Sequence, residues 1–153
     1  MCGIIGIASN KPVSMNIINS LKKLEYRGYD SAGLATLDKD EISEKKCSGR
    51  VEELEKILFK TPSDGHLGIG HVRWATHGVP NIINAHPHSS EIVSIVHNGI
   101  IENSDELKEK LESKGLKFKS QTDTEVITLL ITEALKDNKP LESVFNTLKQ
   151  LKG

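Results

Sequence analysis

The start of the chain constrains the fold most, because a short apolar run, residues 3–8, follows Met1 and Cys2 directly. A membrane-spanning helix needs about 20 apolar residues, and this run is far shorter. It also lacks the basic flank of a signal peptide. A short isoleucine-rich run of this kind is typical of a buried strand. We therefore expect a central strand here, with Cys2 immediately before it.

The remaining pattern interleaves helices and strands. Ser14 is expected to cap the first helix, and Thr122 and Glu125 form a predicted capping box for a later one. A long irregular loop is expected over residues 76–89, where function is often found. The order predicts an α+β fold or a layered α/β sandwich. The expected strands are 3–8, 32–37, 41–47, 66–74 and 92–97 continued at 100–101, and the expected helices are 14–25, 51–59, 104–114, 122 onward, and from Pro140 to the end.

Composition limits the classes of partner and compartment. The 153 residues suit one domain, assigned here to residues 1–153. The 20 basic and 21 acidic residues leave a net charge of -1, which favours neither a nucleic acid nor a membrane surface as partner. Cys2 and Cys47 are the only cysteines, so a disulfide framework is not indicated and a cytoplasmic location is expected.

Cys2 is the sharpest candidate for chemistry. Aminopeptidases remove an initiator methionine when the next side chain is small, and removal of Met1 would leave a thiol and a free α-amine on one residue. Unperturbed α-amines have a pKa of about 7.7 to 8 and thiols of about 8.5, so a proton passes easily between such groups at neutral pH. One residue would then supply nucleophile, base and acid. The alternative is a small buried residue that opens a strand.

Other segments suit acyl transfer from an amino acid, although each has a plain structural alternative. Asn98 and Gly99 could donate two hydrogen bonds to an oxyanion, yet Asn-Gly is also a common hairpin turn. Arg73 could bind a carboxylate in bidentate fashion or form a structural ion pair, and Trp74 could exclude water or fill a core. Asp123 could bind an ammonium group or simply favour a helix N-terminus.

Metal and nucleotide sites are not expected. The pair His86 and His88 suggests a metal, but neither the cysteine spacing nor an H-E-x-x-H helix supports zinc. The segment 68–70 lacks the third glycine and the helix of a dinucleotide loop. We predict no metal and no cofactor.

Taken together, several segments resemble one family. Residues 2–7 are similar to the opening of the class II glutamine amidotransferases, which are N-terminal nucleophile hydrolases. Further segments, in the same order, resemble the glucosamine-6-phosphate synthase branch of that family. They are residues 24–33, 73–78, 84–88, 97–103 and 122–126.

The resemblance implies a four-layer α-β-β-α sandwich and a role for each site residue. Cys2 would attack the γ-carboxamide of L-glutamine and form a γ-glutamyl thioester. Arg73 would bind the α-carboxylate and Asp123 the α-ammonium. Asn98 and Gly99 would form the oxyanion hole, and Arg27 would orient the nucleophile. Trp74, Thr76 and His77 would belong to a loop that closes over glutamine. Trp74 would also gate the passage of ammonia.

The resemblance also implies partners. Ammonia would pass to fructose 6-phosphate on a sugar-isomerase region, and the full-length enzyme would be a homo-oligomer. The family domain continues beyond Gly153 with further strands, so we expect an incomplete sandwich with weak or absent turnover in isolation. The alternative is a catalytically incompetent fragment that binds glutamine or a partner chain.

Overall fold

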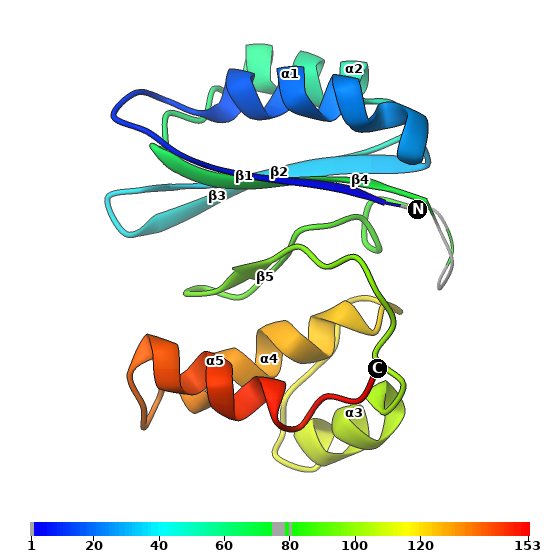
Figure 1. Cartoon of the computed structure of the whole chain (residues 1–153), viewed down its shortest axis with the longest axis vertical. Coiled ribbons are helices and arrows are strands. Elements are labelled where there is room, and N and C mark those ends of the chain that lie inside the picture. Colours follow the sequence, from blue (N-terminus) through cyan, green and yellow to red (C-terminus); the bar gives the residue numbers. More distant parts are fainter. Residues whose placement is uncertain (1, 75–78, 80) are drawn as a thin grey trace.

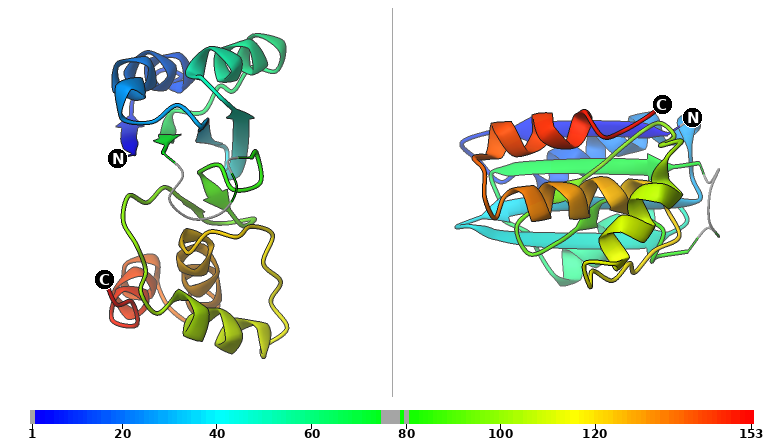
Figure 2. Two further views of the ribbon diagram at one scale, coloured as in Figure 1. Left: turned by 90° about the vertical axis from the view of Figure 1, so that its right-hand side faces the viewer. Right: turned by 90° about the horizontal axis from the view of Figure 1, so that it is seen from below.

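The computed structural model describes residues 2–74, 79 and 81–153. Helices and strands stack in layers in the order helix, sheet, strand ribbon, helix (Figure 1). The predicted α-β-β-α order is therefore confirmed. A view turned by 90° shows the same layers edge-on (Figure 2). None of the described helices is long and apolar enough to cross a membrane.

The first sheet consists of strands β1 (Gly3–Ala8), β2 (Ser31–Asp38), β3 (Glu41–Ser48) and β4 (Leu67–Arg73). Among the described residues, their order is β1-β4-β2-β3, and every neighbouring pair is antiparallel. The predicted hairpin between β2 and β3 is confirmed. Its turn places Lys39 and Asp40 at positive φ, as a tight primed turn requires.

The prediction of a central position for β1 was wrong, because β1 lies at the edge of this sheet and pairs only with β4 in the described part of the chain. Its two faces differ, and Ile4 is 46% exposed while Ile5 packs against the core. An apolar run alone does not reveal whether a strand has one neighbour or two.

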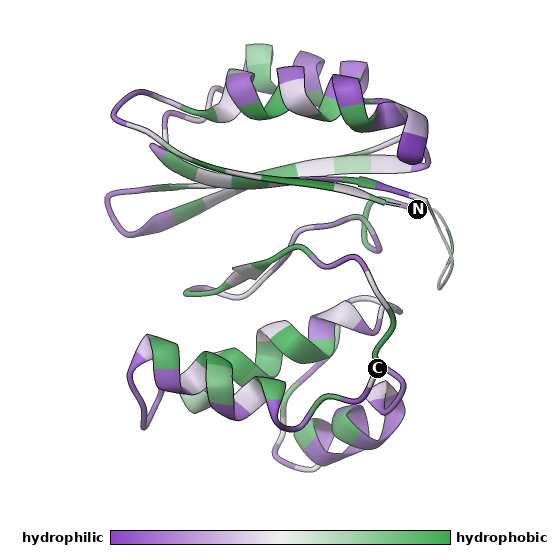
Figure 3. Ribbon diagram, viewed as in Figure 1, coloured by the Kyte–Doolittle hydropathy of each residue, from purple (hydrophilic) through white to green (hydrophobic). Residues whose placement is uncertain are grey.

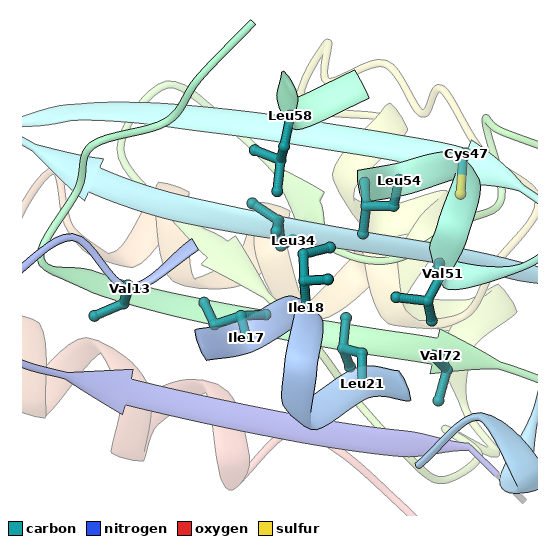
Figure 4. Close-up of a cluster of buried hydrophobic side chains, with 11 residues drawn as sticks. Val13, Ile17, Ile18, Leu21, Leu34, Cys47, Val51, Leu54, Leu58 and Val72 are labelled. Carbon is teal, nitrogen blue, oxygen red and sulfur yellow. The ribbon is translucent and has the colours of Figure 1, made fainter. Parts of the chain in front are cut away.

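One face of the sheet is covered by helices α1 (Ser14–Leu24) and α2 (Val51–Lys60), with a short 3₁₀ turn, η1 (Glu25–Arg27), after α1. Both helices alternate hydrophobic and hydrophilic residues along the ribbon, as amphipathic helices do (Figure 3). Their apolar side chains meet those of the sheet in a core shown in Figure 4. This core comprises Val13, Ile17, Ile18, Leu21, Ala32, Leu34, Cys47, Val51, Leu54, Leu58 and Val72.

The opposite face of the sheet meets a short ribbon in which β5 (His88–Ser89) pairs antiparallel with β6 (Ser94–Ile95). Helices α3 (Ser104–Glu112), α4 (Thr124–Ala134) and α5 (Pro140–Leu148) follow. They surround a second core, which includes Val93, Ile101, Leu107, Leu111, Val126, Ile127, Leu130 and Ile131. Gly115 has a φ of +86° just after α3, which agrees with its predicted role in ending the helix.

Three local predictions were wrong. Ser14 lies inside α1 instead of capping it, and Val13 is the N-cap. The strand expected over 92–97 and 100–101 is only two residues long, because the main-chain groups of His97 are bound by histidine side chains instead of a neighbouring strand. Helix α4 begins at Thr124 with Asp123 as N-cap, so the capping box from Thr122 does not form.

The carboxylate of Glu125 explains the later start of α4. It accepts hydrogen bonds from the main-chain N–H groups of Lys119 and Ser120 at 2.9 and 2.7 Å, and from the Ser120 hydroxyl at 2.7 Å. The Thr122 hydroxyl is 2.8 Å from His88 Nε2. The segment before α4 is thereby bonded to β5.

Candidate active site

Cys2 lies where β1 begins and β4 ends. Gly3 pairs with Val72 in the antiparallel register, so the residue before Gly3 comes beside the last residues of β4. The main-chain N–H of Trp74 donates to Cys2 Sγ at 3.4 Å, and the thiol is 3.7 Å from the Trp74 carbonyl oxygen. An N–H donor aimed at sulfur stabilises negative charge there. The half-buried thiol is therefore held in place while it remains open to a substrate.

The main chain of Cys2 is held from two further directions. Arg27 Nε, on η1, donates to the Cys2 carbonyl oxygen at 3.3 Å. Asn98 Nδ2, on the loop after β6, donates to the same oxygen at 3.3 Å. Segments separated by 25 and 96 residues in the chain thus meet at the candidate nucleophile.

A cavity of about 280 Å³ opens beside Cys2. That volume lies at the lower end of the range for small-molecule sites, which is roughly 300 to 1,000 Å³. It suits a ligand of amino-acid size. The residues that line it are Cys2, Arg73, Trp74, His86, His97, Asn98, Gly99, Ile100, Thr122, Asp123 and Thr124.

Arg73 supplies the positive charge of the cavity wall. It is the last residue of β4, and only 4% of its surface is exposed. Burial lowers the pKa of Arg73, while the nearby groups of Cys2, Asp30 and Asp123 raise it. A guanidinium remains protonated in proteins despite such a shift. The cavity therefore contains a fixed cation that a carboxylate would neutralise.

Asp123 supplies a carboxylate on the same cavity. Its Oδ2 accepts a hydrogen bond from the main-chain N–H of Ile101 at 2.7 Å. No side-chain capping bond to α4 is formed by Asp123, although it occupies the N-cap position. The carboxylate is thus directed across to the loop after Asn98 and Gly99.

Gly99 is required by a close approach to the His97 ring. A Cβ atom at this position would lie 2.7 Å from His97 Nε2, which is nearer than side chains approach each other. That ring is itself fixed, because His97 Nδ1 lies 3.1 Å from Thr124 Oγ1. Glycine therefore allows the main chain to turn tightly beside the cavity.

Buried histidines behind the cavity were missed as site residues. His71 and His86 stack with ring centroids 4.2 Å apart, and His88 meets His86 edge-on at 4.7 Å. Burial lowers the pKa of His71 to about 4 and that of His88 to about 3, and it also lowers the pKa of His86 and of His97. These rings are therefore neutral at physiological pH.

A signal for His71 was present in the sequence. Alternate residues of a strand share one face, so His71 and Arg73 of β4 point to the same side of the sheet. The prediction of Arg73 as a site residue could have been extended to His71 on this ground. Within the described residues, no group of three or more His, Cys, Asp or Glu side chains is arranged to hold a metal ion.

The structure thus brings Cys2, Arg73, Trp74, Asn98, Gly99 and Asp123 to one cavity, with Arg27 bonded to the main chain of Cys2. Thr76 and His77, the remaining predicted site residues, lie outside the described residues. Trp74 is 45% exposed, and its ring meets that of Tyr29 edge-on, with centroids 5.7 Å apart.

Comparisons with known proteins agree with this geometry. A family described as "Glutamine amidotransferase domain" matches residues 58–142. The chain is 53% identical over 154 aligned residues to glutamine–fructose-6-phosphate aminotransferase (isomerizing) of Mesorhizobium japonicum, and 50% identical to the Brucella abortus enzyme of the same name. Each alignment covers 100% of this chain and 25% of the relative, so the chain spans about a quarter of the length of these relatives.

Solved structures give the same picture at lower identity. Glutamine phosphoribosylpyrophosphate amidotransferase from B. subtilis superimposes with a TM-score of 0.85 at 28% identity, covering 100% of this chain and 33% of that one. An allosteric regulatory enzyme of purine biosynthesis superimposes with a TM-score of 0.86 at 28% identity, covering 100% and 34%.

Proposed function

Because the chain belongs to the glutamine amidotransferase domain family, we propose that it hydrolyses L-glutamine to glutamate and ammonia with Cys2 as the nucleophile. The observation that carries this proposal is the single cavity lined by a thiol, a buried guanidinium and a carboxylate. A free amino acid presents matching groups, namely a carboxylate, an ammonium and a side chain that ends in a carboxamide.

The charges suggest how glutamine would lie. Its α-carboxylate would pair with the Arg73 guanidinium, whose planar donors bind carboxylates in bidentate fashion. Its α-ammonium would pair with Asp123, whose Oδ2 is already bonded to the Ile101 N–H. Anchored at that end, the substrate would present its γ-carboxamide carbon to the Cys2 sulfur, and such positioning lowers the entropic part of the barrier.

The chemistry then follows from the residues at the sulfur. Once Met1 is removed, the α-amine of Cys2 accepts the thiol proton, and the thiolate attacks the carbonyl carbon of the γ-carboxamide. The tetrahedral oxyanion accepts hydrogen bonds from Asn98 Nδ2 and the Gly99 N–H. Collapse breaks the carbon–nitrogen bond, and the α-ammonium returns its proton to the departing ammonia. Water then hydrolyses the γ-glutamyl thioester to glutamate and regenerates the thiol.

Asn98 must change partners during this reaction. In the structure its Nδ2 donates to the Cys2 carbonyl oxygen at 3.3 Å, so the amide is already beside the nucleophile. A small rotation of the side chain would direct a donor toward the oxyanion. The bond to the carbonyl oxygen is long, and a bond of this length is weak enough to be exchanged.

The acceptor of the ammonia is a further part of the proposal. The relatives in which this segment forms a quarter of the length are named for transfer to fructose 6-phosphate. We infer that the ammonia serves the synthesis of glucosamine 6-phosphate on a sugar-isomerase region, with Trp74, Thr76 and His77 closing over glutamine and Trp74 gating the passage of ammonia.

The proposal is tested by trapping the nucleophile. The protein is treated with 6-diazo-5-oxo-L-norleucine, a diazoketone analogue of glutamine, and its intact mass and a peptide digest are measured. One covalent adduct on Cys2 is expected, formed more slowly when excess glutamine is present. Cys2→Ala should give no adduct, and Cys47→Ala should give the wild-type adduct because Cys47 is buried in the first core.

A parallel assay distinguishes hydrolysis of glutamine from binding alone. It measures the release of glutamate and ammonia from glutamine by the chain with and without prior reaction with the diazoketone. A retained Met1, read from the intact mass, would remove the proposed base. An absence of adduct on a chain that lacks Met1 would favour a domain that binds glutamine or a partner without hydrolysis.

A further inference from the structure

His97 precedes the proposed oxyanion donors Asn98 and Gly99, and its two main-chain polar groups and its ring Nδ1 are close to side chains from other parts of the fold. Its main-chain carbonyl oxygen lies 3.2 Å from His71 Nε2 on β4. Its main-chain N–H donates to His86 Nδ1 at 3.4 Å. Its ring Nδ1 lies 3.1 Å from Thr124 Oγ1 at the start of α4. The residue is therefore fixed from three directions.

We propose that His71 and His86 are positioning residues that hold Asn98 and Gly99 beside the Cys2 thiol by binding both main-chain polar groups of His97. The inference rests on the proposed function, in which Asn98 and Gly99 stabilise the oxyanion. It adds residues that the reaction does not contact directly but on which its geometry depends.

The hydrogen bonds define the tautomer of each ring. A carbonyl oxygen only accepts, so His71 must carry its proton on Nε2, and its Nδ1 is then unprotonated. That Nδ1 is buried and has no hydrogen-bond partner among the described residues. His86 must be unprotonated at Nδ1 because that atom accepts the His97 N–H. His86 must therefore be neutral for the arrangement to exist, and a proton on His71 Nδ1 would be buried without an acceptor among the described residues.

The surroundings of these rings favour the neutral form. His71 is 1% exposed and His86 is 5% exposed, and their rings stack with an interplanar angle of 16°. Burial lowers the pKa of each ring, and the charges of Arg73 and His97 act in the same direction on both. The hydrogen bond to the His97 carbonyl oxygen acts in the opposite direction on the pKa of His71. A positive charge on this buried stack would lie close to the charge of the Arg73 guanidinium.

The loop is held at its other end as well. The N–H of Ile101 donates to Asp123 Oδ2 at 2.7 Å. Three residues, 98–100, thus lie between a fixed His97 and a fixed Ile101. Loss of the hydrogen bonds between His97 and the rings of His71 and His86 would free one end of the loop, while the bond from Ile101 to Asp123 remains. The expected consequence is a displaced oxyanion site with an intact binding site for the α-groups of glutamine.

Paired substitutions at His71 test this consequence. His71→Leu removes the donor at similar size, and His71→Gln keeps an N–H near the position of Nε2. We expect His71→Leu to lower kcat for glutamine hydrolysis about 10- to 100-fold, the range for a misplaced catalytic group. His71→Gln should restore most of that loss. KM should change little, because Arg73 and Asp123 are untouched.

Two controls distinguish positioning from a general loss of structure. Alkylation of Cys2 by iodoacetamide passes through no tetrahedral oxyanion, so its rate should be the same in His71→Leu and the wild type. His66→Leu makes the same substitution at an exposed histidine and should leave kcat unchanged. Equal kcat values in His71→Leu and the wild type, or equal losses in His71→Leu and His71→Gln, would overturn the inference.

A measurement on the unmodified chain covers the cases in which a variant fails to fold or the wild type shows no turnover. Nitrogen-15 NMR at pH 7 should show His71 protonated at Nε2 and His86 unprotonated at Nδ1, with slow exchange of the His97 amide proton. An unprotonated Nε2 on His71 or a protonated Nδ1 on His86 overturns the inference. Because weak turnover is expected of the isolated chain, absence of both wild-type turnover and a Cys2 adduct would count against the proposed function. The tautomers would still decide the question of positioning.

Discussion

Gly33→Ala should both destabilise the fold and disturb the candidate site. Gly33 lies on β2 opposite His71 of β4 and Lys46 of β3. A Cβ atom at Gly33 would lie 2.1 Å from the carbonyl oxygen of His86 and 2.9 Å from Lys46 Cγ. The lysine side chain can move aside, but the main chain of His86 must retreat.

The magnitude follows from that contact. Real Cβ atoms essentially never approach within 3.0 Å, so the His86 main chain must move by roughly 1 Å. Overpacking of this kind costs about 1 to 3 kcal/mol of unfolding free energy. A displacement of about 1 Å at a catalytic group lowers the rate about 100-fold. Since His86 lines the cavity, we expect losses in both stability and kcat.

Urea unfolding and glutaminase assays at pH 7 measure the two effects. Gly6→Ala is the matched control, because Gly6 lies on β1 of the same sheet and its added Cβ would meet only Ile69 Cγ2, at 4.0 Å. That substitution should be neutral or stabilising by about 0.4 to 1 kcal/mol. Equal stability and activity of Gly33→Ala and Gly6→Ala would refute the close contact between the His86 main chain and β2.

The remaining predictions concern acid and a buried carboxylate. The pKa of His71 is about 4 and that of His88 about 3 in the fold, so below pH 6.5 the unfolded chain binds protons that the folded chain excludes. Stability should therefore fall on acidification, by about 2 kcal/mol for each ring between pH 7 and pH 5, and His88→Gln should reduce the fall. Equal urea midpoints at the two pH values would contradict this. Glu125→Gln should cost about 2 kcal/mol, because one amide oxygen cannot replace a carboxylate that accepts three bonds, one of them from the Ser120 hydroxyl. Glu133→Gln removes a partly exposed helix pair with Lys136 and should cost less than about 0.5 kcal/mol in the same urea titration.

Local periodicity was sufficient to predict much of the fold. The apolar spacing of Ile17, Ile18 and Leu21 predicted α1, and these side chains are fully buried against the sheet. The turn at residues 38–40 predicted the hairpin of β2 and β3. These elements were predictable because the signals that form them lie within a few residues of one another.

Features that depend on contacts between distant residues were not predictable. The edge position of β1 depends on which strands pair, and the short length of β6 depends on side chains from β4 and the loop near residue 86. The start of α4 depends on the Glu125 carboxylate, which accepts hydrogen bonds from the main-chain N–H groups of Lys119 and Ser120 and not from Thr122. Periodicity carries no information on such choices.

The candidate site divides in the same way. Cys2, Arg73, Asn98, Gly99 and Asp123 were predicted as site residues because their residue types matched the chemistry and the order of motifs matched a family, and all of them line one cavity. The packing of the histidines behind the cavity was not found, because a buried neutral ring and a metal ligand look alike in sequence. Only the positions of the rings in space separate the two.

The pairing of Gly3 with Val72 fixes where the nucleophile can be. Each residue of β1 is paired with a particular residue of β4, so the position of the Cys2 sulfur depends on this register. A shift of one residue would turn every side chain of β1 to the opposite face and move the sulfur about 3.3 Å along the strand. The side chains of β1 can therefore vary more freely than the number of its residues. A one-residue insertion after Cys2 should be more damaging than any conservative replacement in the same strand.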